Sequence, residues 1–210
     1  MRNLKEQFSD QEIKSVYLEI TKVLASINLY LCGGFVPYLL LNEDSKRFHH
    51  DIEFIASLEE MNKIREILKK TKYYIPSQDS LNLLKNSDDY GLEVQVREIS
   101  VGIYPYTIID NKIYQYSYNA NHQRFKIKII EENLHNYLKE YLSYDGNDYK
   151  TISLEYLRKS KELASREKDI LDIKAIDKYG YDQTIYENIK IPHPINFQNK
   201  TLEEMKGCEL

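Results

Sequence analysis

The chain has 210 residues, no tryptophan, only two cysteines and no large excess of either charge. Cys32 and Cys208 are too few for a disulfide framework or a cysteine-rich zinc site, so we expect a protein of the reducing cytoplasm. With 29 basic and 33 acidic residues, the net charge is −4. This balance does not indicate a broadly basic surface for nucleic acid, although a local basic patch remains open.

Long apolar runs are also missing. No segment approaches the ~20 apolar residues that a membrane-spanning helix needs, so we predict no membrane association. Residues 1–10 are polar and lack the apolar stretch of a signal peptide. Tyrosine, by contrast, is abundant, with 19 copies. An AT-rich coding sequence is the simpler explanation, and the alternative is that a few of these rings stack on a ligand.

Residues 31–54 are the most informative stretch of the chain. An apolar run ends in Gly33 and Gly34, and the next apolar segment predicts a short helix over residues 36–41. A polar loop follows, and residues 51–56 then have the alternation of a strand. The stretch therefore predicts a strand, a glycine turn, a short helix and a second strand.

Two carboxylates mark the second strand. Asp51 and Glu53 are two residues apart, so both side chains point to the same face. Adjacent anions repel each other unless they bind a cation or share a proton. Gly33 and Gly34 occupy a strand-to-helix turn, where backbone N–H groups can face a phosphate. The combination indicates metal-assisted phosphoryl or nucleotidyl transfer, and the plain alternative is a solvated strand after an ordinary turn.

The same residues carry a family resemblance. Gly33-Gly34, a short apolar helix and the motif Arg47-x-x-His50-Asp51-Ile52-Glu53 resemble the core signature of the polymerase-β-like nucleotidyltransferase superfamily. The motif is most similar to the small bacterial branch that includes lincosamide and aminoglycoside nucleotidyltransferases and abortive-infection toxin nucleotidyltransferases. That branch usually has aspartate where this chain has Glu53, so the carboxylate here is one methylene further from the backbone.

The resemblance implies a metal site. Asp51 and Glu53 are expected to bind one or two Mg²⁺ ions, and a third acid on a neighbouring strand is expected to complete the site or to act as general base. We choose Glu93, which lies on the polar face of a strand predicted over residues 92–97, and keep Asp89 as the fallback. A surface glutamate on an edge strand is the alternative. For His49 and its neighbour we expect a structural or hydrogen-bonding role instead of zinc binding.

A second motif lies late in the chain. The segment 166–172, with Arg166, Lys168, Asp169 and Asp172, resembles a helix of the same branch that packs the helical lobe on the core and directs a basic residue at the triphosphate. We therefore predict nucleotide contacts by Lys161 and Lys168. Gly33, Gly34 and Arg47 complete the predicted nucleotide-binding set, since arginine suits bidentate phosphate contacts. An ordinary salt-bridged helix face is the alternative for the late lysines.

Basic residues also alternate along a strand predicted over residues 124–130. Arg124, Lys126 and Lys128 share one face of this strand. They form either a basic strip for an acceptor or an ordinary solvated face, and the solvated face is the simpler interpretation.

The hydrophobic pattern predicts an α/β or α+β protein with a mixed β-sheet flanked by helices and a C-terminal helical lobe. We place a catalytic core at residues 1–130 and the lobe with its tail at residues 131–210. Within this scheme residues 81–84 are predicted to be a strand, residues 131–142 a helix and residues 191–194 extended.

The predicted reaction moves a nucleoside monophosphate from a nucleoside triphosphate such as ATP to a hydroxyl acceptor and releases pyrophosphate. A small molecule, for example an antibiotic, is the favoured acceptor. In-line attack of this kind depends on positioning and charge neutralisation. Two alternatives stay open: a toxin that modifies RNA or protein, and a catalytically degenerate protein that binds a nucleotide without turnover.

Overall fold

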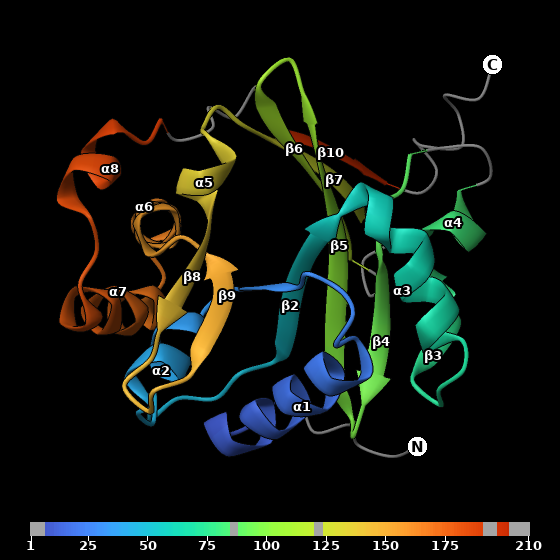
Figure 1. The fold of residues 1–210 in the computed structure, drawn as a ribbon, viewed down its shortest axis with the longest axis horizontal. Coiled ribbons are helices and arrows are strands. Elements are labelled where there is room, and N and C mark those ends of the chain that lie inside the picture. Colours follow the sequence, from blue (N-terminus) through green and yellow to red (C-terminus); the bar gives the residue numbers. More distant parts are fainter. Residues whose placement is uncertain (1–6, 85–87, 120–123, 191–196, 202–210) are drawn as a thin grey trace.

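The computed structural model describes residues 7–84, 88–119, 124–190 and 197–201, and Figure 1 shows their arrangement. In this part of the chain ten strands form one mixed sheet, with the order β10-β7-β6-β5-β2-β1-β9-β8 and with β4 beside β5 and β3 beside β4. The strands are β1 Tyr30–Cys32, β2 Asp51–Ser57, β3 Tyr74–Asp79, β4 Leu92–Val96, β5 Ile99–Ile109, β6 Lys112–Asn119, β7 Arg124–Ile130, β8 Leu138–Leu142, β9 Asp148–Ile152 and β10 Phe197–Thr201.

Helices cover both faces of this sheet. They are α1 Asp10–Val23, α2 Val36–Leu41, α3 Met61–Leu68, α4 Ser80–Leu83, α5 Leu134–Tyr137, α6 Leu154–Ala164, α7 Glu167–Tyr179 and α8 Gln183–Asn188, with a 3₁₀ turn η1 Leu58–Glu60. Figure 1 shows α2, α6, α7 and α8 gathered on one side of the molecule, and contacts join α7 to both α2 and α6. No helix in the described residues is long and apolar enough to cross a membrane.

Strand β5 is the central element of the sheet. It runs parallel to β2, while its other edge pairs antiparallel with β4 up to Ile103 and with β6 from Tyr106 onward. Pro105 lies at this changeover, where none of the described strands pairs with that edge, and proline is tolerated at such a break because it donates no ladder hydrogen bond. One long strand thus supports two different hairpin arms.

The hydrophobic core fixes which face of β2 carries the acids. Ile52 and Phe54 are buried, and the Phe54 ring stacks on Tyr17 of α1 with 5.9 Å between ring centroids. Helix α1 begins with a capping box between Ser9 and Glu12. Because strand side chains alternate, Asp51 and Glu53 point to the opposite face, away from α1.

Two sequence predictions of secondary structure are wrong. Residues 131–142 have helical spacing of apolar residues, but only the short helix α5 forms before β8 pairs with β9. The pairing with β9 buries Leu138 and outweighs the local helical pattern. Residues 81–84 fall mostly in α4 instead of a strand, because Asp79 caps that turn by accepting a hydrogen bond from the Leu81 amide.

The division of the chain at residues 130 and 131 stays a prediction. Helices α6, α7 and α8 do follow this point, but β8 and β9 come from the same segment, and β9 pairs in parallel with β1. The C-terminal segment therefore contributes strands to the main sheet as well as helices. The predicted extended segment 191–194 lies outside the described residues.

Candidate active site

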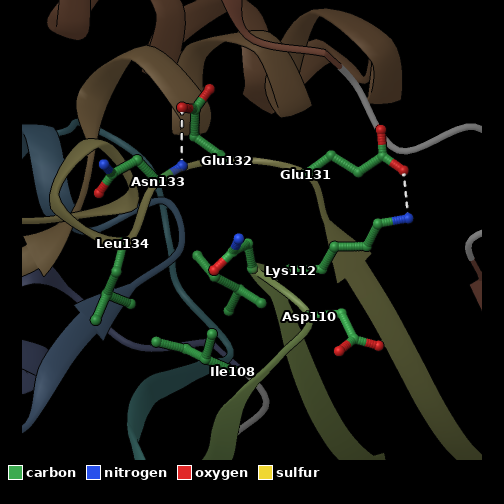
Figure 2. A pocket seen from close by; sticks show the side chains of 9 residues that line it. Ile108, Asp110, Lys112, Glu131, Glu132, Asn133 and Leu134 are labelled. Carbon is green, nitrogen blue, oxygen red and sulfur yellow. Dashed lines mark hydrogen bonds and ion pairs between the residues drawn. The ribbon is translucent and has the colours of Figure 1, made fainter.

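A wide recess of about 680 Å³ opens between the β5–β6 turn and α5 (Figure 2). Ile108, Asp110 and Lys112 line one side, and Glu131 pairs with Lys112 at 3.0 Å. The predicted site residues are all absent from its lining. Since Ile108 lies six residues beyond Gly102 on β5, the recess is roughly 20 Å along the strand from the acids.

Two of the predicted acids lie in one row of paired residues that crosses strands β2, β5 and β4; we call this row, together with Asp51, the acid row. Gly102 of β5 pairs with Glu53 of β2 on one side and with Glu93 of β4 on the other. Residues paired across strands share a face, so both glutamates project from the same face with only a glycine between them. Strands lie about 4.8 Å apart, so the two glutamate Cα atoms are separated by roughly 10 Å.

Tyr104 fills the space that Gly102 leaves open. A Cβ atom at Gly102 would lie 2.4 Å from the Tyr104 hydroxyl oxygen. That hydroxyl donates to Glu93 Oε1 at 3.2 Å, and Ser100 Oγ donates to Glu93 Oε2 at 3.4 Å. Glu93 is thus buried and held in place by two hydroxyl groups, so it is not the surface glutamate of the alternative interpretation.

Negative charge is concentrated at the acids, although Lys126 and Lys161 offset part of it at Glu53. Burial, and next the charges of Asp51 and Glu93, raise the pKa of Glu53 well above its ordinary value. Burial and the same three acids also raise the pKa of Tyr104. Asp51, at the start of β2, is exposed. The row is therefore an environment that a cation or a shared proton would stabilise.

A small cavity of about 60 Å³ lies beside the acids and collects the predicted residues from four elements. Its lining includes all seven of the predicted residues other than Glu93, which belongs to the neighbouring row: Gly33, Gly34, Arg47, Asp51, Glu53, Lys161 and Lys168. Gly33 directly follows β1, and a Cβ atom there would come within 3.8 Å of Glu53 Oε2. The glycine turn and the acid strand are therefore in direct proximity.

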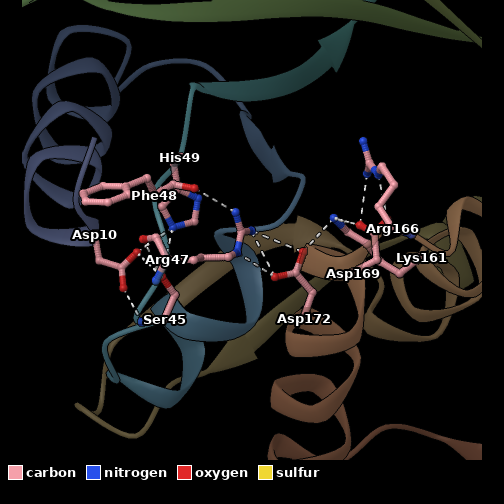
Figure 3. Close-up of polar contacts among 9 residues, drawn as sticks. All are labelled: Asp10, Ser45, Arg47, Phe48, His49, Lys161, Arg166, Asp169 and Asp172. Carbon is pink, nitrogen blue, oxygen red and sulfur yellow. Dashed lines mark hydrogen bonds and ion pairs between the residues drawn. The ribbon is translucent and has the colours of Figure 1, made fainter. Parts of the chain in front are cut away.

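Two cations of the cavity are already paired with carboxylates of α7 (Figure 3). Arg47 Nε donates to Asp172 Oδ1 at 3.1 Å and its Nη2 to Oδ2 at 3.2 Å. Lys161 of α6 lies 2.7 Å from Asp172 Oδ2 and 3.0 Å from Asp169 Oδ1. Because the Asp172 side chain has 0% exposure, this carboxylate is a buried bridge between the loop before β2 and the α6–α7 pair.

Positive charge is in excess on this side of the cavity. Lys168 has a lowered pKa, first because it is partly buried and then because Arg166, Lys161 and Arg47 are close. The pKa of Asp169 is lowered, because hydrogen bonds from Arg166 and Lys161 outweigh the opposing effect of burial. An anion in the cavity would relieve the repulsion among these cations.

His49 has the structural role that was expected. Its Nε2 lies 2.5 Å from Asp10 Oδ1 and 3.3 Å from Ser45 Oγ, and its backbone pairs with Phe8. These contacts anchor the loop before β2 to the start of α1, as Figure 3 shows. Asp10 also accepts a hydrogen bond from the Ser45 amide, and its pKa is lowered by His49 and Ser45 despite burial.

Gly34 has no room for a side chain. A Cβ atom at this position would lie 2.1 Å from Arg47 Nη2 and 2.7 Å from Asp172 Oδ2. We expect Gly34→Ala to displace Arg47 and to lower the free energy of unfolding by about 1–3 kcal/mol, measured by urea denaturation. In an Arg47→Ala background the same substitution should cost less. An equal cost in both backgrounds would contradict the proposed clash.

The donor set suits Mg²⁺ in kind, because carboxylate oxygens are the ligands that this ion prefers. The raised pKa of Glu53 points in the same direction, since a bound cation would stabilise its charged form. Among the residues that the structure describes, however, no group of three or more His, Cys, Asp or Glu side chains is arranged to hold a metal ion. Substrate oxygens would therefore have to complete the coordination of an ion held by Asp51 and Glu53.

Several residues at the site were missed or misjudged by sequence analysis. Tyr104 and Gly102 were not singled out, although a glycine inside a strand indicates a close approach. Asp172 was quoted only as part of a motif, and its pairing with Arg47 spans 125 residues. The fallback acid Asp89 is not at the site, since it pairs with Arg65 at 2.6 Å.

The sequence matches no family model and no curated protein, but solved structures share its fold. The lincomycin-bound crystal structure of the lincosamide antibiotic adenylyltransferase LnuA has a TM-score of 0.50 and 17% identity, covering 83% of this chain and 99% of that chain. The solution structure of the antibiotic-resistance factor ANT(2'')-Ia has a TM-score of 0.54 and 14% identity, covering 85% and 89%.

A crystal structure of ANT(2'')-Ia with adenylyl-2''-tobramycin has a TM-score of 0.50 and 13% identity, covering 84% of this chain and 95% of that chain. At such low identity these likenesses establish the fold. The predicted nucleotidyltransferase fold, with its mixed sheet flanked by helices, is confirmed.

Proposed function

We propose that this chain, which has the fold of antibiotic nucleotidyltransferases, transfers a nucleoside monophosphate from a nucleoside triphosphate to the hydroxyl of a small molecule. The acceptor oxygen forms a bond to the α-phosphorus while the bond from that phosphorus to pyrophosphate breaks. The hydroxyl proton passes to a carboxylate of the acid row, and pyrophosphate leaves with the electron pair of the broken bond.

One observation carries this proposal: opposite charge excesses face each other across one cavity. Burial, and next its basic neighbours, destabilise Lys168 as a cation, and burial, and next Asp51 and Glu93, destabilise Glu53 as an anion. Both residues line the cavity that Gly33 closes. A divalent cation with a polyphosphate would relieve both excesses together.

The residues divide into two groups by charge. Arg47, Lys161 and Lys168 would neutralise the triphosphate, and the backbone of the glycine turn would approach its oxygens. Asp51 and Glu53, with Glu93 held by Tyr104, would hold one or two Mg²⁺ ions, which supply charge neutralisation at the leaving pyrophosphate and polarise the attacking hydroxyl. This metal assignment is part of the proposal.

The carboxylates of α7 pair with the same cations that would bind the triphosphate. Asp172 forms ion pairs with Arg47 and Lys161, and Asp169 forms a second ion pair with Lys161. An arriving triphosphate would compete for the same guanidinium and ammonium groups. Binding would therefore be accompanied by a rearrangement of α7 contacts, and the buried acids would keep the two cations oriented in the meantime.

Lys168 offers the sharpest test of nucleotide binding. We expect the protein to bind at least one of ATP, GTP, CTP and UTP in the presence of Mg²⁺, and Lys168→Met to weaken that binding about tenfold. Isothermal titration calorimetry measures both affinities. Lys174→Met, a lysine of the same helix outside the cavity, is the matched control. If none of the four triphosphates binds, or if both variants behave alike, the proposed function fails.

A catalytically inactive nucleotide-binding protein is the second candidate. The wide acid row and the longer side chain at position 53 favour it, because the described residues contain no preassembled ligand set. Measuring pyrophosphate release against lincomycin, tobramycin and total RNA separates the candidates. Triphosphate binding without release for any acceptor would support the inactive protein.

A further inference from the structure

Two lysines of β7 approach the acid row from outside the glycine cavity. Lys126 and Lys128 alternate along the strand and so share one face. The charge of Lys126 acts on Glu53, and the charge of Glu53 acts on Lys128, so both lysines lie near that carboxylate. Neither of them lines the cavity that holds Gly33, Lys161 and Lys168.

Glu53 is therefore flanked by cations from two separate elements. Lys161 of α6 acts on it from the cavity, and Lys126 acts on it from β7. In an in-line transfer the acceptor enters on the side of the α-phosphorus opposite the leaving pyrophosphate. Lys126 and Lys128 act with Glu53 but do not line the cavity assigned to the phosphates, which fits a place on the acceptor side.

Lys128 lies against a buried tyrosine of α6. Its Nζ lies 4.4 Å above the ring centroid of Tyr156, and burial lowers the pKa of the ammonium group to about 8. Tyr156 is buried, with 3% exposure, and its hydroxyl has no hydrogen-bond partner among the described residues. Lys128 is thus a desolvated cation above a buried ring, and an anionic oxygen at its ammonium group would offset the cost of that burial.

We propose that Lys126, Lys128 and Tyr156 form an acceptor subsite, and that the acceptor is a hydroxyl compound with a phosphate or carboxylate group. This inference rests on the proposed function, because it defines the acceptor of that reaction. A cationic acceptor would meet two ammonium groups and be repelled, so the basic strip selects by charge. The anionic group would contact Lys128 while the hydroxyl lies at the acid row.

Three sugars that share the same ring but differ in net charge test the subsite. Glucose is neutral, glucose 6-phosphate is anionic and glucosamine is cationic. We measure their binding by titration calorimetry to the free protein and to the protein saturated with Mg²⁺ and a non-hydrolysable α,β-methylene triphosphate, which keeps the sugar phosphate out of the nucleotide cavity. Glucose 6-phosphate should bind about tenfold or more tightly than glucose, and glucosamine more weakly than glucose.

Substitutions then identify the residues that cause the preference for glucose 6-phosphate. Lys128→Met should reduce the advantage of glucose 6-phosphate to about twofold or less, Lys126→Met should reduce it in part, and Lys112→Met, at the start of β6, should leave it unchanged. Thermal unfolding should show that Lys128→Met is at least as stable as the parent, because it removes a partly buried charge.

Equal affinity for the three sugars, including undetectable binding of all of them, would overturn the inference. So would an anion preference that survives both β7 substitutions. The two proposals fail separately. If the protein binds no triphosphate but shows the Lys128-dependent preference, the subsite stands and the proposed reaction fails. If it binds a triphosphate without that preference, the proposed reaction stands and the subsite fails.

Discussion

Replacing Asp51 with asparagine is expected to lower pyrophosphate release by at least about 10³-fold. Asparagine keeps the size of the side chain but loses the charge that a divalent cation needs at this position. Asp51 is exposed at the start of β2, so the fold should be unaffected. The measurement is the initial rate of pyrophosphate release with the best acceptor found, at saturating Mg²⁺ and nucleoside triphosphate.

Asp44→Asn is the matched control for this experiment. Asp44 is also exposed, lies in the loop that leads to β2, and accepts a hydrogen bond from the Lys46 amide that asparagine can also accept. It should leave the rate unchanged. If Asp51→Asn retains the parent rate, the acid row is not the reacting centre, and circular dichroism of both variants checks that neither has unfolded.

Asp172→Asn should produce the largest loss of stability among the substitutions considered. The side chain has 0% exposure and is bonded to Arg47 on one side and Lys161 on the other. Neutralising it leaves two largely buried cations without their shared counter-charge. We expect the free energy of unfolding to fall by about 3 kcal/mol, the lower end of the range for breaking a buried ion pair. For a chain of this size that corresponds to a fall in Tm of about 6–12 °C.

Glu167→Gln serves as the control for Asp172. Glu167 is exposed in the first turn of the same helix, so its replacement should change Tm by no more than about 1–2 °C. Differential scanning calorimetry compares the two variants with the parent. A fall in Tm no larger for Asp172→Asn than for Glu167→Gln would show that the bridge does not stabilise the fold.

Local patterns were enough to predict one half of the site. A strand, a glycine pair and a second strand with acids at alternate positions are features of neighbouring residues, so Gly33, Gly34, Asp51 and Glu53 could be identified from the sequence. Lys161 and Lys168 were predicted from the resemblance of the late helix, and both line the same cavity, while their nucleotide contacts stay a prediction. Backbone periodicity predicts which faces these residues occupy, whereas their metal and nucleotide roles rest on the family resemblance and stay predictions.

The other half of the site depends on strand register and on distant pairs. That Gly102 separates Glu53 from Glu93 follows from how β2 and β4 pair with β5, which no local pattern specifies. The short helix and strand after residue 133 were missed for a related reason. Their apolar spacing is helical, but hydrogen bonds to β9 decide the conformation.

The tight packing around Gly34 links positions 34, 47 and 172, which lie far apart in the chain. Glycine is required at position 34 only as long as the guanidinium and carboxylate of the other two occupy the space beside it. In natural sequences of this type, a residue larger than glycine at position 34 should therefore occur together with changes at positions 47 or 172. Correlated substitution at these three positions would therefore be a consequence of this one close contact.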